Sequence, residues 1–312
     1  MTPNAGKPLW KIAASPINWC NDDLLDLGDE YSVESIWQDM AQAGVAGTEM
    51  GRKYSHQAAE LRPQLEAYGL ALASGWGTVH LADRRNWTAS LAAYERHVEF
   101  LAAMGCAVAV TCEGSGSVHW DRGGDRSQVV RWDDEAWKTV ALGLNEAGKR
   151  AQALGVRLVY HPHLGTNIEQ LSAIDRLMET TDPDWVGLCL DTGHVAASGW
   201  DPMAVWARYH DRIDHLHLKD IRPPVVQRFY QGLGFLDGVR QGLFTVPGDG
   251  VIDFRSLLQG LQSQGYDGWL VIEAEQDPAL APPRTALEKA LSYLRTCTEA
   301  ASAVGISDEV VR

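Results

Sequence analysis

Four polar segments in the second half of the chain bring histidines and carboxylates to the ends of short apolar runs. They are Tyr160 to His163 (YHPH), Asp191 to His194 (DTGH), His215 to Asp220 (HLHLKD) and Glu273 to Glu275 (EAE). Short apolar runs that stop at such groups are typical of buried strands. Imidazoles and carboxylates are also the ligands that proteins offer to Mn²⁺, Co²⁺ and Fe²⁺. The segments therefore predict a metal site where several parallel strands end.

The spacing within these segments decides which side chains share a face. Side chains two residues apart on a strand point to the same side of the sheet. On this basis we expect four residues to meet at the mouth of a barrel and to bind one divalent ion: His161, Asp191, His217 and Glu273. A lone histidine at a strand end is more often a hydrogen-bonded core or loop residue, but four such ends on consecutive strands favour a shared site.

The first half of the chain offers polar groups that could contact a substrate. Asn18 and Glu49 follow the first two expected strands, and we interpret them as groups that bind hydroxyls. Lys53 either pairs with Glu49 or acts on the substrate. Trp76 could place its ring against the C–H surface of a carbohydrate, although plain packing explains a single tryptophan equally well. The remaining histidines lack a strand-end setting, and surface or helical positions are expected for them: His56, His80, His97, His119 and His210.

Strand and helix patterns alternate along the whole chain. The expected strands cover 10–15, 45–50, 70–76, 106–112, 156–159, 185–190, a run that starts at 213, and 269–272. The expected helices cover 33–43, 56–68, 88–104, 133–154, 168–179, 202–209, 254–264 and 283–298. Glycines at 44, 69, 105, 155 and 265 are placed to end helices in the left-handed conformation. Eight such units predict an α/β protein whose residues 1–312 form a single (β/α)₈ barrel domain.

One long connection interrupts this alternation. Residues 221–250 look irregular and combine Phe229, Tyr230, Phe235 and Phe244 with several glycines. Because the segment is too apolar for a disordered linker, we expect a lid or insertion over the pocket.

The overall composition and charge limit the classes of molecule that the protein is expected to bind. The 312 residues carry a formal charge of −14, which leaves no basic footprint for nucleic acid or anionic lipid. No run is long enough for a signal peptide or a membrane span. The five cysteines are scattered and have no CxxC spacing, so a reducing cytoplasm is expected. A small neutral or cationic ligand fits this composition. The sequence leaves open whether the protein forms a homo-oligomer.

Several motifs carry a resemblance to a known family. LDTGH (190–194), HLHLKD (215–220) and VIE (271–273) are general marks of the xylose isomerase-like barrel superfamily. Narrower marks are SPINWCNDD (15–23), GTEMGRKY (47–54), YHPHLGT (160–166), FLDGVRQGLFTVPGDG (235–250) and EAEQDP (273–278). With these segments the chain resembles the inosose dehydratases of inositol catabolism.

The resemblance implies a carbon–oxygen lyase that removes water from 2-keto-myo-inositol and forms a trihydroxycyclohexane-1,2-dione. It places the metal ligands on Asp191, His217 and Glu273, with His161 where most superfamily members have a glutamate. His194, Lys219 and Glu49 would lie on the substrate side. The resemblance also implies Mn²⁺ or Co²⁺. Glutathione is sometimes named as a cofactor of such enzymes, but no feature of this sequence indicates a glutathione site.

Catalytic roles stay open at the level of sequence. His163, Glu113 or a metal-bound hydroxide could remove the proton next to the ketone, and Lys219, His194 or His163 could protonate the leaving hydroxyl. A ketose 3-epimerase or sugar isomerase is the alternative reaction, although His161 stands where an epimerase would need a carboxylate. A metal-dependent nuclease is disfavoured by the acidic charge, and a sugar-binding protein by the open metal-ligand set. We expect changes at the mouth to affect metal and activity more than stability.

Overall fold

Nine parallel strands line the centre of the molecule. The computed structural model describes residues 10–121 and 124–304. The strands of the main sheet are β1 Lys11–Ala14, β2 Gly47–Thr48, β3 Ala71–Leu72, β4 Trp76–Val79, β5 Val108–Glu113, β6 Arg157–Tyr160, β7 Val186–Asp191, β8 Ile213–Leu218 and β11 Trp269–Ile272. Their order is β3-β2-β1-β11-β8-β7-β6-β5-β4, and neighbouring strands in this sheet pair in parallel.

The strands at the two ends of this order, β3 and β4, both come from the single strand predicted at 70–76. β3 and β4 are separated by only three residues, 73–75, so the sheet returns to its starting point and closes. Ser74 joins the two parts, because its Oγ contacts the carbonyl of Val108 and accepts from the amide of Val110 on β5, both at 3.3 Å. The expected strand 70–76 is thus split where it passes from β2 to β5. The prediction of a (β/α)₈ barrel is confirmed.

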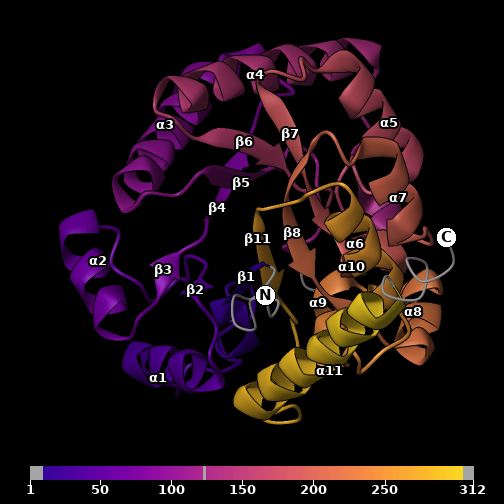
Figure 1. Cartoon of the computed structure of the whole chain (residues 1–312). Coiled ribbons are helices and arrows are strands. Elements are labelled where there is room, and N and C mark those ends of the chain that lie inside the picture. The colour runs from indigo at the N-terminus through magenta and orange to yellow at the C-terminus, as the bar shows by residue number, and fades with distance from the viewer. Residues whose placement is uncertain (1–9, 122–123, 305–312) are drawn as a thin grey trace, which may run out of the picture.

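Helices surround the strands on the outside (Figure 1). They are α1 Val33–Ala43, α2 Ala58–Ala67, α3 Trp87–Met104, α4 Asp134–Ala153, α5 Leu171–Thr180, α6 Thr192–Ala197, α7 Pro202–Tyr209, α8 Pro223–Tyr230, α9 Phe235–Arg240, α10 Phe254–Ser263 and α11 Pro283–Val304. Side-chain caps start several of them; Ser32 accepts from the amide of Ser35, and Asp133 from that of Ala136. Gly44 and Gly105 end α1 and α3 with φ of 84°, as their spacing predicts.

Two layers of apolar side chains hold the barrel together. Inside it, Val108, Val110, Val159 and Cys189 form one buried cluster, and the apolar faces of the outer helices pack against the strands from the other side. β5 and β7 are buried along their whole length because both of their faces are covered. In the described part of the chain, no helix is long and apolar enough to cross a membrane.

The expectation that residues 221–250 are irregular is wrong. The segment contains α8, α9 and a short antiparallel pair, β9 Asp220–Ile221 with β10 Phe244–Thr245. Apolar residues spaced three or four apart, such as Val226 and Phe229, give α8 a buried face, and the segment packs into a second hydrophobic cluster. Helices this short are hard to recognise from periodicity alone. The segment therefore owes its order to tertiary packing.

Candidate active site

A pocket opens at the carboxyl ends of the barrel strands. Its walls are Ser15, Ile17, Asp22, Asp23, Glu49, Met50, Trp76, Val110, His119, Trp120, His161, His163, His194, His217, Glu273 and Glu275. Most of these residues lie in or just after β1, β2, β4, β6, β7, β8 and β11. This is the end of the barrel where such folds carry their chemistry.

The four expected metal ligands lie close together; His161, His217 and Glu273 line the pocket, and Asp191 is buried next to them. Asp191 Oδ2 is 3.3 Å from His161 Nε2 and 3.6 Å from His217 Nδ1. His217 Nδ1 is in turn 3.4 Å from Glu273 Oε2. Asp191 ends β7, and its other oxygen, Oδ1, accepts the amide of His194 at 2.8 Å and caps α6. The turn from strand to helix therefore holds the carboxylate toward the barrel axis.

The donor set around His217 fits a cation. His217 Nε2 lies 3.2 Å from Glu49 Oε1, so the ring proton on this nitrogen is donated to a carboxylate. In the neutral ring that can bind a metal, Nδ1 carries a lone pair, and it faces oxygens of Asp191 and Glu273 with no hydrogen-bond partner among the described residues. Three electron-rich atoms this close repel one another unless positive charge lies between them. A histidine that donates its second nitrogen to a carboxylate is also the usual arrangement of a metal ligand.

Glu49 thus lies next to the expected ligands. Its Oε1 is 2.9 Å from His215 Nε2 as well as 3.2 Å from His217 Nε2. The residue still lines the pocket, but this oxygen is taken by two imidazoles. Glu49 is therefore placed to orient His217, a role that the sequence interpretation as a hydroxyl-binding group did not include.

Lys219 lies beneath the pocket and does not line it. Its fully buried Nζ is 2.5 Å from Glu273 Oε1, 2.8 Å from Glu275 Oε1 and 3.3 Å from Asp191 Oδ2. Burial lowers the pKa of this ammonium, but the three carboxylates outweigh burial and raise the pKa well above its usual value. A lysine held so firmly in its charged form is a poor proton donor. The structure therefore gives Lys219 the place of a fixed countercharge.

His163 and His194 face the pocket side by side, with ring centroids 4.0 Å apart. The main chain of Leu164 sets both tautomers. His163 Nδ1 donates to the carbonyl of Leu164 at 2.8 Å, while His194 Nδ1 accepts from the amide of Leu164 at 3.2 Å. His163 therefore has a free lone pair on Nε2, and His194 carries its proton on Nε2.

Both rings are held neutral. Burial, reinforced by the neighbouring histidines His194, His119 and His161, holds the pKa of His163 well below its usual value. Burial and then Lys219 lower the pKa of His194 to about 4. The site thus presents one neutral acceptor and one neutral donor next to each other.

Three expected site residues have other partners. Asn18 Nδ2 donates to the carbonyl of Ile272, and its Oδ1 accepts the amide of Ala274, so it secures the strand end that carries Glu273. Glu113 accepts the amides of Leu81 and Ser115 and the Ser115 hydroxyl, at 2.6 to 2.9 Å. Neither residue lines the pocket. Their hydrogen-bonding capacity serves the fold, which a strand-end position alone does not reveal.

Lys53 also turns away from the pocket. Its Nζ donates to the carbonyls of Asp29 and Tyr31 and lies 3.2 Å from Asp29 Oδ1. Lys53 forms no salt bridge with Glu49 and does not line the pocket, because the loop after β1 binds its ammonium group. Trp76, by contrast, lines the pocket and stands edge-on to His161 with ring centroids 5.1 Å apart.

Sequence reasoning missed several wall residues. His119, expected at the surface or on a helix, is buried and lines the pocket, where it packs on Trp120 at a centroid distance of 3.8 Å. It lies far beyond the end of β5, so its spacing offers no strand-end signal. Asp22 and Asp23 lie even further beyond the end of β1, so a strand-end position does not reveal them either, although both fall within the SPINWCNDD motif. Burial raises their pKa values to about 6 and about 7.

Comparisons with known proteins agree with this architecture. Residues 37–297 match the family model described as xylose isomerase-like TIM barrel. The chain is 42% identical over 288 residues to the inosose dehydratase of Geobacillus kaustophilus, covering 91% of this chain and 94% of that protein. It is 42% identical over 292 residues to the inosose dehydratase of Klebsiella pneumoniae subsp. pneumoniae, covering 91% and 96%.

Solved structures share the fold at low identity. A probable 3-DHS dehydratase from Bacillus anthracis superposes with a TM-score of 0.67 and 15% identity, covering 91% of this chain and 98% of that one. The IOLI protein, in a structure with a binding zinc atom, gives a TM-score of 0.67 and 15% identity over 92% of this chain and 97% of that one.

Proposed function

This chain belongs to the inosose dehydratase family of xylose isomerase-like TIM barrels, and from this premise we propose that it removes water from 2-keto-myo-inositol to give a trihydroxycyclohexane-1,2-dione. The enzyme class, a hydro-lyase, follows from the family. The observation that carries the proposal is the pair of neutral histidines with opposite tautomers beside a cluster of metal-ligand atoms.

Asp191, His217 and Glu273 would hold the metal ion, with His161 as a fourth ligand. The first three offer ligand atoms within 4.8 Å of one another, and His161 Nε2 is 3.3 Å from the shared Asp191 oxygen. When bound, a divalent ion such as Mn²⁺ or Co²⁺ supplies Lewis acidity to the ketone oxygen and so acidifies the neighbouring C–H bond. Glu49 orients His217, and Lys219 balances the buried carboxylates.

His163 is the group that we assign to proton transfer. Its Nε2 lone pair takes the proton from the carbon next to the ketone, and the C–H electrons form the new double bond as the C–O bond of the β-hydroxyl breaks. The low pKa of His163 makes the resulting imidazolium a strong acid, so it returns the same proton to the departing hydroxyl and water leaves. Proton and hydroxyl then depart from one face of the ring.

His194 assists without transferring its proton. Its Nδ1 accepts a main-chain amide, so loss of the Nε2 proton would leave an imidazolate, which is far too basic to form here. The Nε2–H therefore donates a hydrogen bond to a substrate oxygen. Glu275 Oε1 lies 3.6 Å away, beyond hydrogen-bond distance, so this N–H is left for the substrate.

The acidic wall supports a neutral substrate. Asp22, Asp23, Glu49, Glu273 and Glu275 line the pocket, and no lysine or arginine does. A phosphorylated or carboxylated sugar would find no lysine or arginine on the pocket wall to bind its charge, whereas hydroxyls can donate to these oxygens. Trp76 and Trp120 offer ring faces and edges to the C–H surface of a polyol.

The epimerase alternative is less well supported. Epimerisation needs an acid and a base on opposite faces of one carbon. His163 and His194 stand on the same side, 4.0 Å apart, and the position where an epimerase would need a carboxylate is His161.

One assay separates the two reactions. Purified protein is freed of metal by chelation, reloaded with Mn²⁺ or Co²⁺, and incubated with 2-keto-myo-inositol and, separately, with a free ketohexose. We expect an ultraviolet-absorbing enolised dione from the inositol ketone and an unchanged ketohexose. Epimerised ketohexose without dione would assign the protein to the alternative reaction, and equal activity of the chelated sample would remove the metal from the proposal.

A further inference from the structure

One histidine of the pocket wall has no part in the reaction described above and no partner in the protein. The His119 side chain is only 2% exposed and lines the pocket. Neither of its ring nitrogens has a hydrogen-bond partner among the described residues. His163 and His194, by contrast, both bond to the main chain of Leu164. Because a buried polar atom left unpaired costs about 1–3 kcal/mol, His119 is not explained by the stability of the fold.

Only one of the two ring nitrogens can obtain a partner from the pocket. Nδ1 of His119 is closed off by protein atoms, whereas Nε2 is not among the enclosed nitrogens, and the ring borders the pocket. Nε2 is therefore the atom that a bound molecule can reach. In a neutral imidazole this nitrogen donates or accepts, depending on the tautomer. A hydroxyl can pair with either form, because it both donates and accepts.

The ring of His119 is held in its neutral form. Burial, and then the neighbouring His194, lower the pKa of His119 to about 3. An imidazole with this pKa neither attracts an anion by charge nor retains a second proton near neutral pH. The contact that His119 offers is therefore an uncharged hydrogen bond, which suits an alcohol better than a phosphate or a carboxylate.

The position of the ring is fixed from two sides. It packs between Trp120 and His163, with ring centroids 3.8 and 4.6 Å away. The loop that carries it is tied to the turn after β6, because the amide of Val118 donates to the carbonyl of Gly165 at 2.9 Å. A Cβ at Gly165 would lie 3.2 Å from the main-chain nitrogen of His119, so glycine permits this close approach. A ring held in place before binding loses little entropy when it forms a hydrogen bond.

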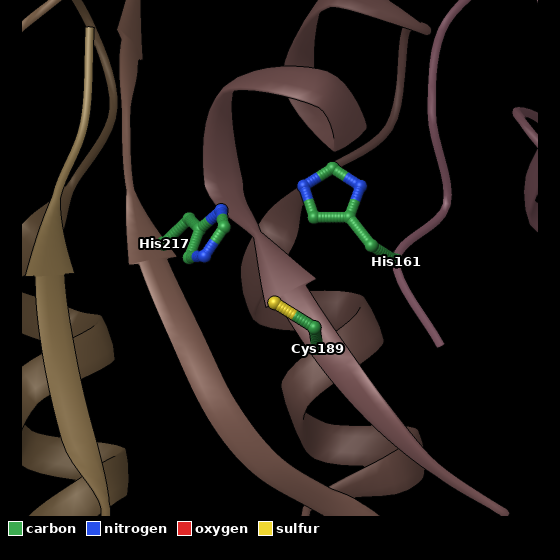
Figure 2. Close-up of side chains that lie close together, drawn as sticks. All are labelled: His161, Cys189 and His217. Carbon is green, nitrogen blue, oxygen red and sulfur yellow. The ribbon is translucent and has the colours of Figure 1, made fainter. Parts of the chain in front are cut away.

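His119 lies between the proposed proton-transfer group and the rim of the pocket. Neighbouring rings follow one another in the order His217, His161, His163, His119 and Trp120, with centroid distances of 5.2, 5.7, 4.6 and 3.8 Å. Figure 2 shows the two rings at the proposed metal end, His161 and His217, close together. Trp120 at the other end is 40% exposed. A substrate whose ketone oxygen lies at the metal end therefore presents its more distant hydroxyls to His119.

We propose that His119 Nε2 binds a substrate hydroxyl on a ring carbon that takes no part in the elimination, and that this contact selects among polyol ketones. This assignment rests on the proposed function, because the bound polyol is the substrate of that reaction. The hydrogen bond is the same before and during the elimination. It should therefore lower KM and have little effect on kcat, in contrast to the bond that His163 makes with the transferred proton.

A phenylalanine at this position separates binding from stability. His119→Phe keeps the ring packing and removes both nitrogens, and loss of an unpaired buried nitrogen removes its desolvation cost. We expect a Tm equal to or above that of the wild type. The KM for 2-keto-myo-inositol should rise about tenfold, which corresponds to the loss of one neutral hydrogen bond. A lower Tm with an unchanged KM would give His119 a structural role and overturn the proposal.

Two polar replacements locate the contact on the ring. The amide of glutamine reaches the place of Nε2, and that of asparagine the place of Nδ1. We expect His119→Gln to keep a KM close to that of the wild type, and His119→Asn to resemble His119→Phe in KM. His80→Phe is the matched control, because His80 also neighbours Trp120, at a centroid distance of 6.3 Å, but is exposed and does not line the pocket. Its KM should equal that of the wild type.

Deoxy analogues test the hydroxyl itself. Metal-loaded wild type and His119→Phe are compared on 2-keto-myo-inositol and on analogues that each lack one hydroxyl. For one analogue the wild type should lose about tenfold in kcat/KM, and His119→Phe should lose nothing further, because both changes remove the same bond. Equal KM values of the two proteins on the full substrate would mean that only water pairs with Nε2, and would overturn the proposal. A loss that persists in full for every analogue would overturn it as well, because its origin would be altered packing.

An unreactive polyol keeps this test apart from that of the reaction. Calorimetry with metal-loaded protein and myo-inositol, which has no ketone, measures binding without turnover. We expect the affinity to fall about tenfold in His119→Phe and to be retained in His119→Gln. This result together with a failed dehydration assay would contradict the proposed reaction alone. The same affinity in the wild type and His119→Phe would contradict the contact.

Discussion

At the scale of single residues, the site depends on hydrogen bonds that fix which atom carries a proton. One main-chain unit, Leu164, gives His163 and His194 opposite tautomers, and Glu49 leaves the lone pair of His217 facing two carboxylates. Residue types alone do not contain this information, since a neutral histidine can hold its proton on either nitrogen.

Removing the proposed base should slow turnover without loss of metal. We expect His163→Asn to lower kcat by about 10²–10⁴-fold, the usual contribution of a positioned acid or base. His119→Asn, a neighbour on the same wall with no assigned role in proton transfer, should lower kcat far less. Steady-state kinetics and metal analysis on both variants provide the test, and near-normal turnover of His163→Asn would contradict the assignment.

Substitutions of two pocket carboxylates should differ in how much they destabilise the fold. Asp191→Ala removes the cap of α6 and leaves the buried ammonium of Lys219 one partner short, so we expect it to lose metal, activity and about 3–5 kcal/mol of unfolding free energy. This departs from the expectation that mouth residues barely affect stability. Glu273→Gln keeps an oxygen that can accept from Lys219 and should lose metal and activity at a smaller cost.

Urea unfolding and metal content, measured on both variants, separate these effects. Equal stability of Asp191→Ala and the wild type would show that the cap and the ion pair contribute little.

At the scale of elements, short helices after the strands hold the catalytic side chains. α6 starts directly after its N-cap Asp191, and the stem of Lys219 packs onto Gly193 in its first turn. The segment 221–250 stands behind the two histidines: Phe235 packs against His163 with ring centroids 4.9 Å apart, and Phe244 against His194 at 4.8 Å. None of its residues lines the pocket. Closure of the segment as a lid stays a prediction, and the observed contacts are those of a supporting wall.

The contact at Gly193 predicts the sign of a substitution. Alanine normally stabilises a helix relative to glycine by about 1 kcal/mol. A Cβ at 193 would lie 2.6 Å from Lys219 Cγ, which is inside the van der Waals distance in a fully buried place. We therefore expect Gly193→Ala to destabilise the protein, by about 1–3 kcal/mol. Thermal unfolding checks this, and a stabilised variant would mean that Lys219 moves aside freely.

The supporting wall can be tested at Phe235. Phe235→Ala opens a cavity in the cluster beneath α9, which typically costs about 3–5 kcal/mol, and it frees the ring of His163. We expect lower stability together with lower kcat. Tyr230→Ala in the same segment is the control, because that side chain is half exposed and contributes little to the cluster. Hydrogen exchange across 221–250 with and without a substrate analogue would reveal closure.

At the scale of the whole molecule, the barrel gathers negative charge at one end. The chain has a formal charge of −14, and the pocket concentrates carboxylates from several strand ends around a single buried lysine. Such a mouth attracts cations and repels anions. Lys219 balances only part of this negative charge, so the mouth still favours a bound cation.

Metal binding should therefore stabilise the entire fold. A ligand that binds only the native state adds about 2.7 kcal/mol at a concentration of 100 Kd. For a chain of this size we expect the Tm to rise by a few degrees with Mn²⁺ or Co²⁺ relative to chelated protein. The rise should be absent from Glu273→Gln. Calorimetry at matched ionic strength measures it, and an unchanged Tm in the wild type would argue against an ion at this site.

The sequence by itself determined the architecture and the convergence of its strand ends. Strand and helix patterns and terminal glycines are local properties, so they predicted eight strands in order and placed Asp191, His217 and Glu273 at one mouth. The family motifs were likewise contained in contiguous segments.

Only the tertiary structure decided how each polar group is used. Asn18, Glu113 and Lys53 have the residue types of a site but bond to main chain or to Asp29, whereas His119 enters the pocket from a loop without strand spacing. The thiol of Cys189 meets two histidines from other segments. Such pairings join residues far apart in the chain, and their free energy depends on burial and hydrogen-bond geometry that no local pattern encodes.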